Sequence, residues 1–148
     1  MNFDECTKTK VKKMHQRMFF LRKLKSFHVD RCILQMFYKS VLQSILSFGL
    51  TCVFGNMRVK DQMKLQRMIK MASRVIGCSQ TSAEQLCKDL IVSKAERILN
   101  DPAHPLYSKF KRGCRGNGRI LQRKITTNRF GNSFIPSAIR LLNDKVRR

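Results

Sequence analysis

The chain has 148 residues, enough for one domain with a single hydrophobic core. Hydrophobic residues make up 43% of it, a share typical of globular proteins that argues against a disordered chain. Its 31 Lys and Arg face only 9 Asp and Glu, which gives a formal net charge of +22. So large a positive charge repels itself unless a polyanion gathers on it. Nucleic acid is therefore the first candidate partner and an anionic membrane surface the second.

The cysteines and the N-terminus indicate an intracellular protein, in the cytoplasm or nucleus. None of the six cysteines stands in a C-x-x-C pair of the kind found in zinc or redox sites. Asp4, Glu5 and several lysines occupy the place where a secretory signal would need an apolar segment. The uncharged stretch between Lys39 and Arg58 is interrupted by polar residues and is short for a membrane span, so we interpret it as a core helix.

Helical periodicity begins at the N-terminus. The first predicted helix, 6–27, carries an apolar row at spacings of three and four, made of Val11, Met14, Met18, Leu21 and Leu24. The second, 30–54, is apolar on most sides and is expected at the centre of the fold. In the turn after it, Gly55 and Asn56 are expected to take the positive φ that stops a helix.

The third predicted helix, 59–76, separates two kinds of side chain most clearly. Its apolar residues share one arc of about 120° on a helical wheel of about 100° per residue, namely Leu65, Met68, Ile69, Ala72, Val75 and Ile76. Five cations fall in a separate arc with only Asp61 to balance them, whereas a merely solvated face usually mixes both signs. This pattern is typical of a face that binds phosphates.

The remaining elements come after a stop at Gly77. Thr81 to Glu84, "TSAE", matches a capping box that opens a fourth helix up to residue 99, with Leu86, Leu90 and Ile98 on its core face. Two prolines then break the pattern. The glycine-rich, basic stretch 109–129 predicts a loop or arm, and 136–145 predicts a short last helix with Ile139 and Leu142 facing inward.

We therefore expect an all-α, single-domain bundle of four to five helices with a basic arm near the C-terminus. Residues 1–108 would form the helical domain, and 109–148 would form the arm and a short helix packed on it.

Two apparent metal motifs have simpler explanations. His28-Val29-Asp30 matches two thirds of a non-haem iron triad, but no strand is expected to hold a second histidine beside it. We interpret it as a turn in which Asp30 caps the second helix. Cys78, Cys87, His104 and Cys114 lack the spacing of a compact zinc module. No nucleophilic motif, phosphate loop or acidic cluster is present either, so we expect no catalytic residue, metal or cofactor.

Basic residues are the candidate binding site, on three surfaces that together favour a phosphate-binding role. They are Lys12, Lys13, Arg17, Arg22 and Lys23 in the first helix, Lys60, Lys64, Arg67, Lys70 and Arg74 in the third, and Lys109, Lys111, Arg112, Arg115, Arg119, Arg123, Lys124 and Arg129 in the arm. No base-reading motif is visible, so we expect recognition of the nucleic-acid backbone and shape.

Five blocks of sequence resemble, in order, the C-terminal region of reverse transcriptases from LINE-type (non-LTR) retrotransposons. They are "KKMHQRMFFLRKLKSF", "FYKSVLQSILSFGLTCVFGN", "LQRMIKMASRVIG", "KAERILNDPAHPLYSKF" and "NRFGNSFIPSAIRLLN". The resemblance implies the thumb and connecting helices that follow the catalytic palm and grip RNA template or RNA–DNA duplex. The palm's paired aspartates are absent, so a non-catalytic fragment is implied, whose partners would be RNA or duplex and the missing palm.

The first block and the residues after it also resemble the N-terminal segment of AlkB homologue eight, a tRNA hydroxylase and methyltransferase. This alternative implies an accessory segment associated with oxidative dealkylation or methylation of nucleic acid, without the catalytic domains. The two interpretations differ in that the second involves iron or S-adenosylmethionine.

Overall fold

The protein is all-helical, as predicted. The computed structural model describes residues 3–110 and 119–146. Four long helices are α1 (Phe3–Ser26), α5 (Val59–Ile76), α6 (Ala83–Leu99) and α8 (Phe134–Val146). Between α1 and α5 lie α2 (Arg31–Phe37), the π-helical turn η1 (Tyr38–Leu42), α3 (Gln43–Ser47), α4 (Leu50–Val53) and the 3-10 turn η2 (Phe54–Asn56). The turn η3 (Tyr107–Lys109) and α7 (Asn128–Gly131) complete the described elements, none of which is a strand.

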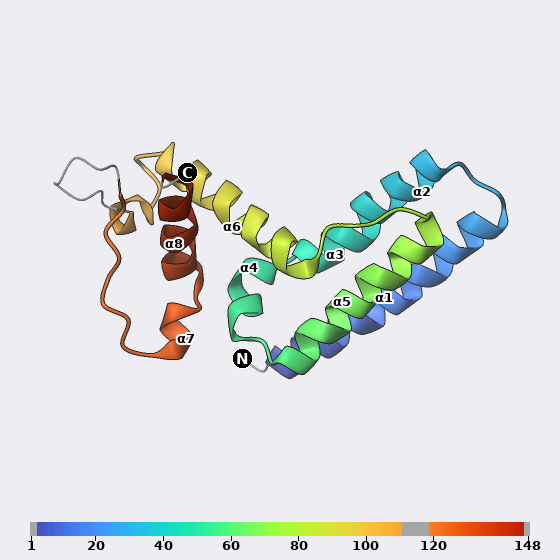
Figure 1. Cartoon of the computed structure of the whole chain (residues 1–148), viewed down its shortest axis with the longest axis horizontal. Coiled ribbons are helices and arrows are strands. Elements are labelled where there is room, and N and C mark those ends of the chain that lie inside the picture. The colour runs from blue at the N-terminus through green and yellow to red at the C-terminus, as the bar shows by residue number, and fades with distance from the viewer. Residues whose placement is uncertain (1–2, 111–118, 147–148) are drawn as a thin grey trace.

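The helices form an elongated molecule with two ends (Figure 1). At one end, α1 and α5 lie side by side and run in the same direction, and the segment from α2 to α3 runs back beside them. The contact between α1 and α5 is the most extensive between any two described elements. Helix α6 leads away from this group, and α8 packs against it at the other end.

Each long helix contributes the apolar row that its sequence predicts. Met14 and Leu21 of α1, Leu65 and Ile69 of α5 and Ile139 of α8 are almost completely buried. Val11, Leu24, Val75 and Leu90 lie at the edges of these rows and are half-buried. Full burial of one such side chain stabilises the fold by about 1.5–3 kcal/mol as an upper estimate. The core is therefore held by these rows rather than by helix propensity.

The prediction of one continuous helix over 30–54 was wrong. The segment opens into the π-helical turn η1 and then breaks at Phe48–Gly49, where Gly49 takes φ +63°. Glycine adopts this left-handed conformation without the penalty that a Cβ carries. The freed carbonyl of Phe48 accepts a hydrogen bond from Lys10 Nζ at 2.5 Å. Lys10 is buried, and its charge lies at the C-terminal end of α3, where the helix dipole favours a cation.

Helix α5 ends at Gly77, as predicted, with φ +80°. Arg31 Nη2 donates to the Gly77 carbonyl at 2.6 Å and so ties the start of α2 to the end of α5. Asp30 holds the N-cap position of α2, but its side chain makes no capping hydrogen bond. His28 lies in the turn before it, with φ +56°.

The predicted capping box was displaced by one residue. Ser82, not Thr81, is the N-cap of α6, and its Oγ accepts the Gln85 amide at 3.2 Å. Glu84 does not reach back, because its carboxylate pairs with Lys88 Nζ at 2.6 Å on the next turn.

The turn predicted at Gly55 and Asn56 is present, but the predicted positive φ is not. Gly55 is required for another reason: its Cα faces the backbone of Asn132, between α7 and α8, and leaves no room for a Cβ. Asn56 Nδ2 donates to the Arg129 carbonyl at 3.2 Å in the same region. These contacts join the C-terminal segment to the turn before α5.

Residues 119–127 of the arm form no helix and are exposed apart from Ile120. The Ile120 backbone amide donates to Asn143 Oδ1 at 2.9 Å, and Asn143 Nδ2 donates to the Ile120 carbonyl at 3.0 Å. These two hydrogen bonds fix this end of the arm to α8. Lys145 pairs with Glu96 at 2.9 Å, between α8 and α6. The division of the chain near residue 108 stays a prediction.

Candidate nucleic-acid interface

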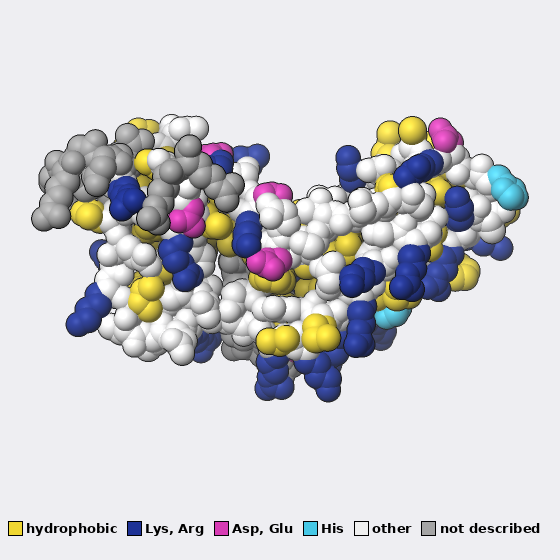
Figure 2. All heavy atoms as spheres, viewed as in Figure 1, with side chains coloured by type: hydrophobic (Ala, Val, Ile, Leu, Met, Phe, Trp, Pro, Cys, Tyr) yellow, Lys and Arg dark blue, Asp and Glu magenta, His cyan; other side chains and the backbone are white. Residues whose placement is uncertain are grey.

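Positive charge is concentrated in two parts of the chain. Residues 1–82 hold 16 Lys and Arg against 4 Asp and Glu, and residues 111–148 hold 11 against 1. Residues 83–110, which include α6, are balanced at 4 against 4. Figure 2 shows Lys and Arg side chains gathered over the half formed by α1 and α5, whereas most acidic side chains on this face lie towards α6 and α8. The helical surface and the arm are therefore two separate basic regions.

Helix α5 carries a row of cations on the side opposite its core residues. Lys60, Arg67, Lys70 and Arg74 are exposed, and none of them forms an ion pair in the described part of the chain. Successive residues rise about 1.5 Å along a helix, so the row extends over about 21 Å. We call these four residues the α5 basic row.

Lys64, predicted to belong to this face, is different. It is half-buried, and its Nζ lies 2.7 Å from Asp61 Oδ1. Asp61 is only 6% exposed. The hydrogen bond from Lys64, helped by the positive charges of Lys64, Arg58 and Lys60, holds the pKa of Asp61 below its usual value although burial acts to raise it. Lys64 is thus partly neutralised and stays outside the row.

The predicted cations of α1 are exposed, but they do not form a single row. They are Lys12, Lys13, Arg17, Arg22 and Lys23. Arg17 lies over the Phe20 ring at 5.9 Å from its centroid, and Lys23 lies over the Phe27 ring at 5.4 Å. Two of these cations are therefore paired with aromatic rings rather than with acids.

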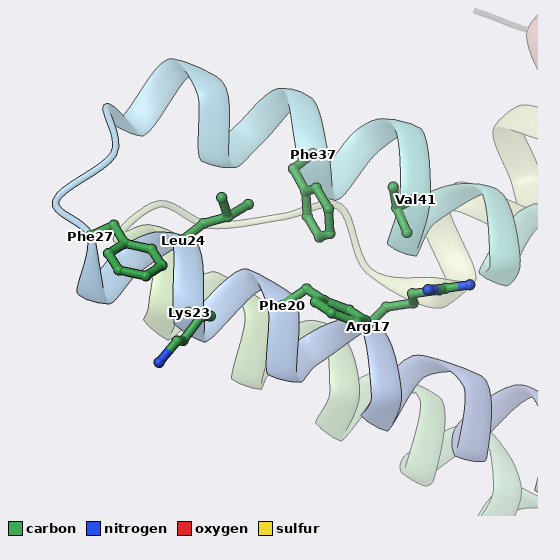
Figure 3. Close-up of a pocket in the computed structure, with 7 residues that line it drawn as sticks. All are labelled: Arg17, Phe20, Lys23, Leu24, Phe27, Phe37 and Val41. Carbon is green, nitrogen blue, oxygen red and sulfur yellow. The ribbon is translucent and has the colours of Figure 1, made fainter.

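Those rings border a groove between α1 and the α2–η1 segment (Figure 3). Phe20 and Leu24 of α1, with Phe27 in the turn after it, form one side, and Phe37 and Val41 point towards them from the other. Arg17 and Lys23 lie at its rim, and its volume is about 500 Å³. We call it the aromatic groove. Our sequence reasoning missed it, although phenylalanines outside the apolar row of a basic helix were a visible signal.

The arm is only partly described. Lys109, Arg119, Arg123, Lys124 and Arg129 are exposed, and the predicted site residues Lys111, Arg112 and Arg115 lie outside the described residues. Arg123 and Lys109 line a cavity of about 240 Å³ with Phe130, Ile135 and Ile139, among other residues. The described arm runs beside α8, apart from α1 and α5 (Figure 1), except at Arg129, whose carbonyl is bonded to Asn56 in the turn before α5.

The candidate metal motifs gain no support. Within residues 3–110 and 119–146, no three His, Cys, Asp or Glu side chains form a group that could hold a metal ion. His28 is exposed in its turn, and Cys114 is outside the described residues. Cys87 is buried, and burial, followed by the nearby Cys52 and Glu84, raises the pKa of its thiol to about 11. It is not a reactive thiolate at neutral pH.

One described stretch, Arg31–Asn56, is long and apolar enough to cross a membrane. Only 28% of its most apolar window is buried in the protein. Leu34, Leu42 and Leu46 face the core, whereas Met36 and Phe48 are exposed. Our interpretation of this stretch as a core helix rather than an anchor stays a prediction.

The fold and the charged surfaces define a basic, all-helical module. A sequence model of the family described as "Alkylated DNA repair protein alkB homolog 8, N-terminal" matches residues 5–44, which form α1, α2, the η1 turn and the start of α3. The match therefore covers the helices that enclose the aromatic groove, and it agrees with the second resemblance found in the sequence. No curated protein and no solved structure matches the chain. The LINE reverse-transcriptase resemblance is not matched and stays a prediction.

Proposed function

We propose that this protein is a non-catalytic, intracellular module that binds nucleic acid through phosphate contacts along α1 and α5. The observation that carries this proposal is the α5 basic row, four exposed cations that form no ion pair among the described residues, on the helix that packs against α1 and its cations. A row of about 21 Å faces several successive phosphates of a duplex or an extended strand. The match to a family named for alkylated DNA repair supports an association with nucleic acid in general.

Phosphate contacts of this kind position a nucleic acid without reading its sequence. We therefore expect RNA or RNA–DNA duplex to bind with little dependence on base sequence and a strong dependence on salt. If six to ten phosphates are neutralised, affinity falls by roughly 10³ to 10⁵ between 50 and 200 mM salt. The arm would add a second basic surface at the other end of the molecule.

The test compares two variants that lose equal charge. One replaces Lys60, Arg67, Lys70 and Arg74 with Gln. The control also introduces four Gln residues, in place of Lys88, Lys94 and Arg97 on the charge-balanced α6 and of Lys145 on α8. Binding of a fluorescent RNA duplex is measured by anisotropy from 50 to 200 mM salt, and helicity by circular dichroism. We expect the first variant to lose affinity and up to about 3.6 of the salt slope, at about 0.9 per phosphate, and the control to change little. Equal losses in both variants would refute a specific α5 surface.

Two candidates for the parent protein arise from the resemblances. The family match favours an accessory segment of an AlkB-like enzyme that oxidises or methylates nucleic acid. Calorimetry with iron(II) or with S-adenosylmethionine tests whether this chain takes part directly, and we expect no heat of binding for either.

The other candidate is a fragment of a retrotransposon reverse transcriptase, separated from its palm. Sequencing the transcript across the start codon tests it. A frame that continues upstream into a palm with paired aspartates would support it, and a frame without them would contradict it.

A further inference from the structure

We propose that the aromatic groove binds unpaired bases of a single-stranded nucleic acid, while Arg17 and Lys23 at its rim contact the phosphates that flank these bases. This inference rests on the proposed function and deepens it, because it names the form of nucleic acid that the α1–α2 hairpin recognises. It predicts two separable contributions to binding, one from charge and one from stacking.

Exposed phenylalanines at the groove are the first observation. Phe20 of α1 is 46% exposed, and Phe27, in the turn directly after α1, is 67% exposed, whereas Met14, Met18 and Leu21 of the same helix are buried. Phe19 is also exposed and contacts Phe20 edge to face, at 5.7 Å between ring centroids. Water-exposed rings of this kind are costly unless a partner covers them, and every base offers a flat π surface that can stack on them.

The positive charge at the rim of the groove indicates an anionic partner. Arg17 and Lys23 line the groove together with apolar residues, and no acidic residue of the described chain lines it. Arg17 extends along the groove in Figure 3. A nucleic-acid base can insert between an arginine guanidinium and an aromatic ring, and Arg17 and Lys23 can both contact the phosphates that flank this base. A purely apolar protein segment would leave these two charges without a counterpart.

The walls of the groove are held in place before any ligand arrives. Phe37 is the last residue of α2, and Val41 lies in the π-helical turn η1, whose Tyr38 is buried in the core. Burial raises the pKa of the Tyr38 phenol to about 12, so this support stays neutral at physiological pH. Single π-turns in α-helices are frequent at functional sites.

The groove fits an unpaired strand better than a duplex. In a duplex the base faces are stacked on one another, so they are not free to stack on the phenylalanine rings.

The experiment compares a fluorescent 12-nucleotide oligouridylate with an RNA duplex of equal charge, on the full chain. The test variant is F20A/F27A, which changes no charge and removes only exposed rings. The matched control is F48A, since Phe48 is 81% exposed but lies outside the groove. Stacking is worth about 1–3 kcal/mol per base, so we expect the double variant to bind the single strand about 5- to 150-fold more weakly. Its duplex affinity and salt slope should equal those of the wild type.

A second variant reports the contact directly. The chain contains no tryptophan, so Phe27→Trp introduces one fluorophore at the groove and keeps a ring there. Stacked bases should quench its emission when oligouridylate binds, and the duplex should leave the emission nearly unchanged.

The outcomes separate this inference from the proposed function. Unchanged single-strand binding by F20A/F27A, or an equal loss for strand and duplex, overturns the groove as a base site while duplex binding through α5 can still hold. A wild-type chain that binds neither probe at low salt overturns both proposals. If sedimentation shows that wild type self-associates, F20A/F27A does not and RNA binding is equal in both, the groove is a contact between copies and the inference is wrong.

Discussion

Gly55→Ala tests how the C-terminal segment is attached to the rest of the fold. A Cβ at residue 55 would lie well inside the 3.0 Å that real Cβ atoms keep from other atoms, against the carbonyl oxygen of Asn132, and at 3.2 Å from its carbonyl carbon. These are backbone atoms of the turn between α7 and α8, so no side-chain rotation can relieve the clash. The turn must move away, and the hydrogen bond from Asn56 to the Arg129 carbonyl must weaken with it.

Overpacking of this kind costs about 1–3 kcal/mol, and for a chain of about 150 residues this lowers Tm by about 2–12 °C. The matched control is Gly49→Ala, because nothing lies within 4 Å of a Cβ there and only the positive φ of +63° is strained, at about 1–2 kcal/mol. Urea unfolding gives the loss of stability. Hydrogen exchange shows where it occurs, and we expect faster exchange at residues 128–134 in G55A but not in G49A. Wild-type stability and exchange in G55A would refute the described docking of α7.

The remaining predictions concern single groups. Ser82→Ala should lower the free energy of unfolding in urea by about 1 kcal/mol, and Thr81→Ala should leave it nearly unchanged, because only the first caps α6; the reverse order would restore the predicted capping box. The pKa of Asp61 is lowered in the folded state, so its stabilising contribution is complete above the unfolded pKa of about 3.9 and is lost as pH falls further. The stability difference between wild type and Asp61→Asn should accordingly shrink towards pH 2, and a constant difference would contradict this. Cys52 should react with a thiol reagent at pH 8 much faster than Cys87, whose pKa is raised to about 11, and equal rates would show that Cys87 is accessible. Finally, flotation with anionic liposomes should be lost at high salt, because charge-driven adhesion is screened there; flotation that persists would indicate insertion of the apolar α2–α4 stretch.

Local sequence was enough for the elements that depend on local pattern. The buried rows of α1, α5 and α8 follow from side chains spaced at three and four residues, which only a helix places on one face. The stop at Gly77 follows from its freedom at positive φ, and Pro136 stands in the first turn of α8, where its missing N–H matters little. The exposed α5 basic row follows from the same periodicity, read on the opposite side of the helix.

The tertiary structure decided whatever depends on residues far apart in the chain. The break after Phe48 is stabilised by Lys10 from another helix, and the end of α5 by Arg31, 46 residues before it. Gly55 is required because of Asn132, a neighbour that no local pattern announces. The aromatic groove likewise exists only because α1 and the η1 turn face each other. Periodicity specifies which side of a helix is apolar, but the partner of each surface is set by packing, and packing created the groove and separated the two basic regions.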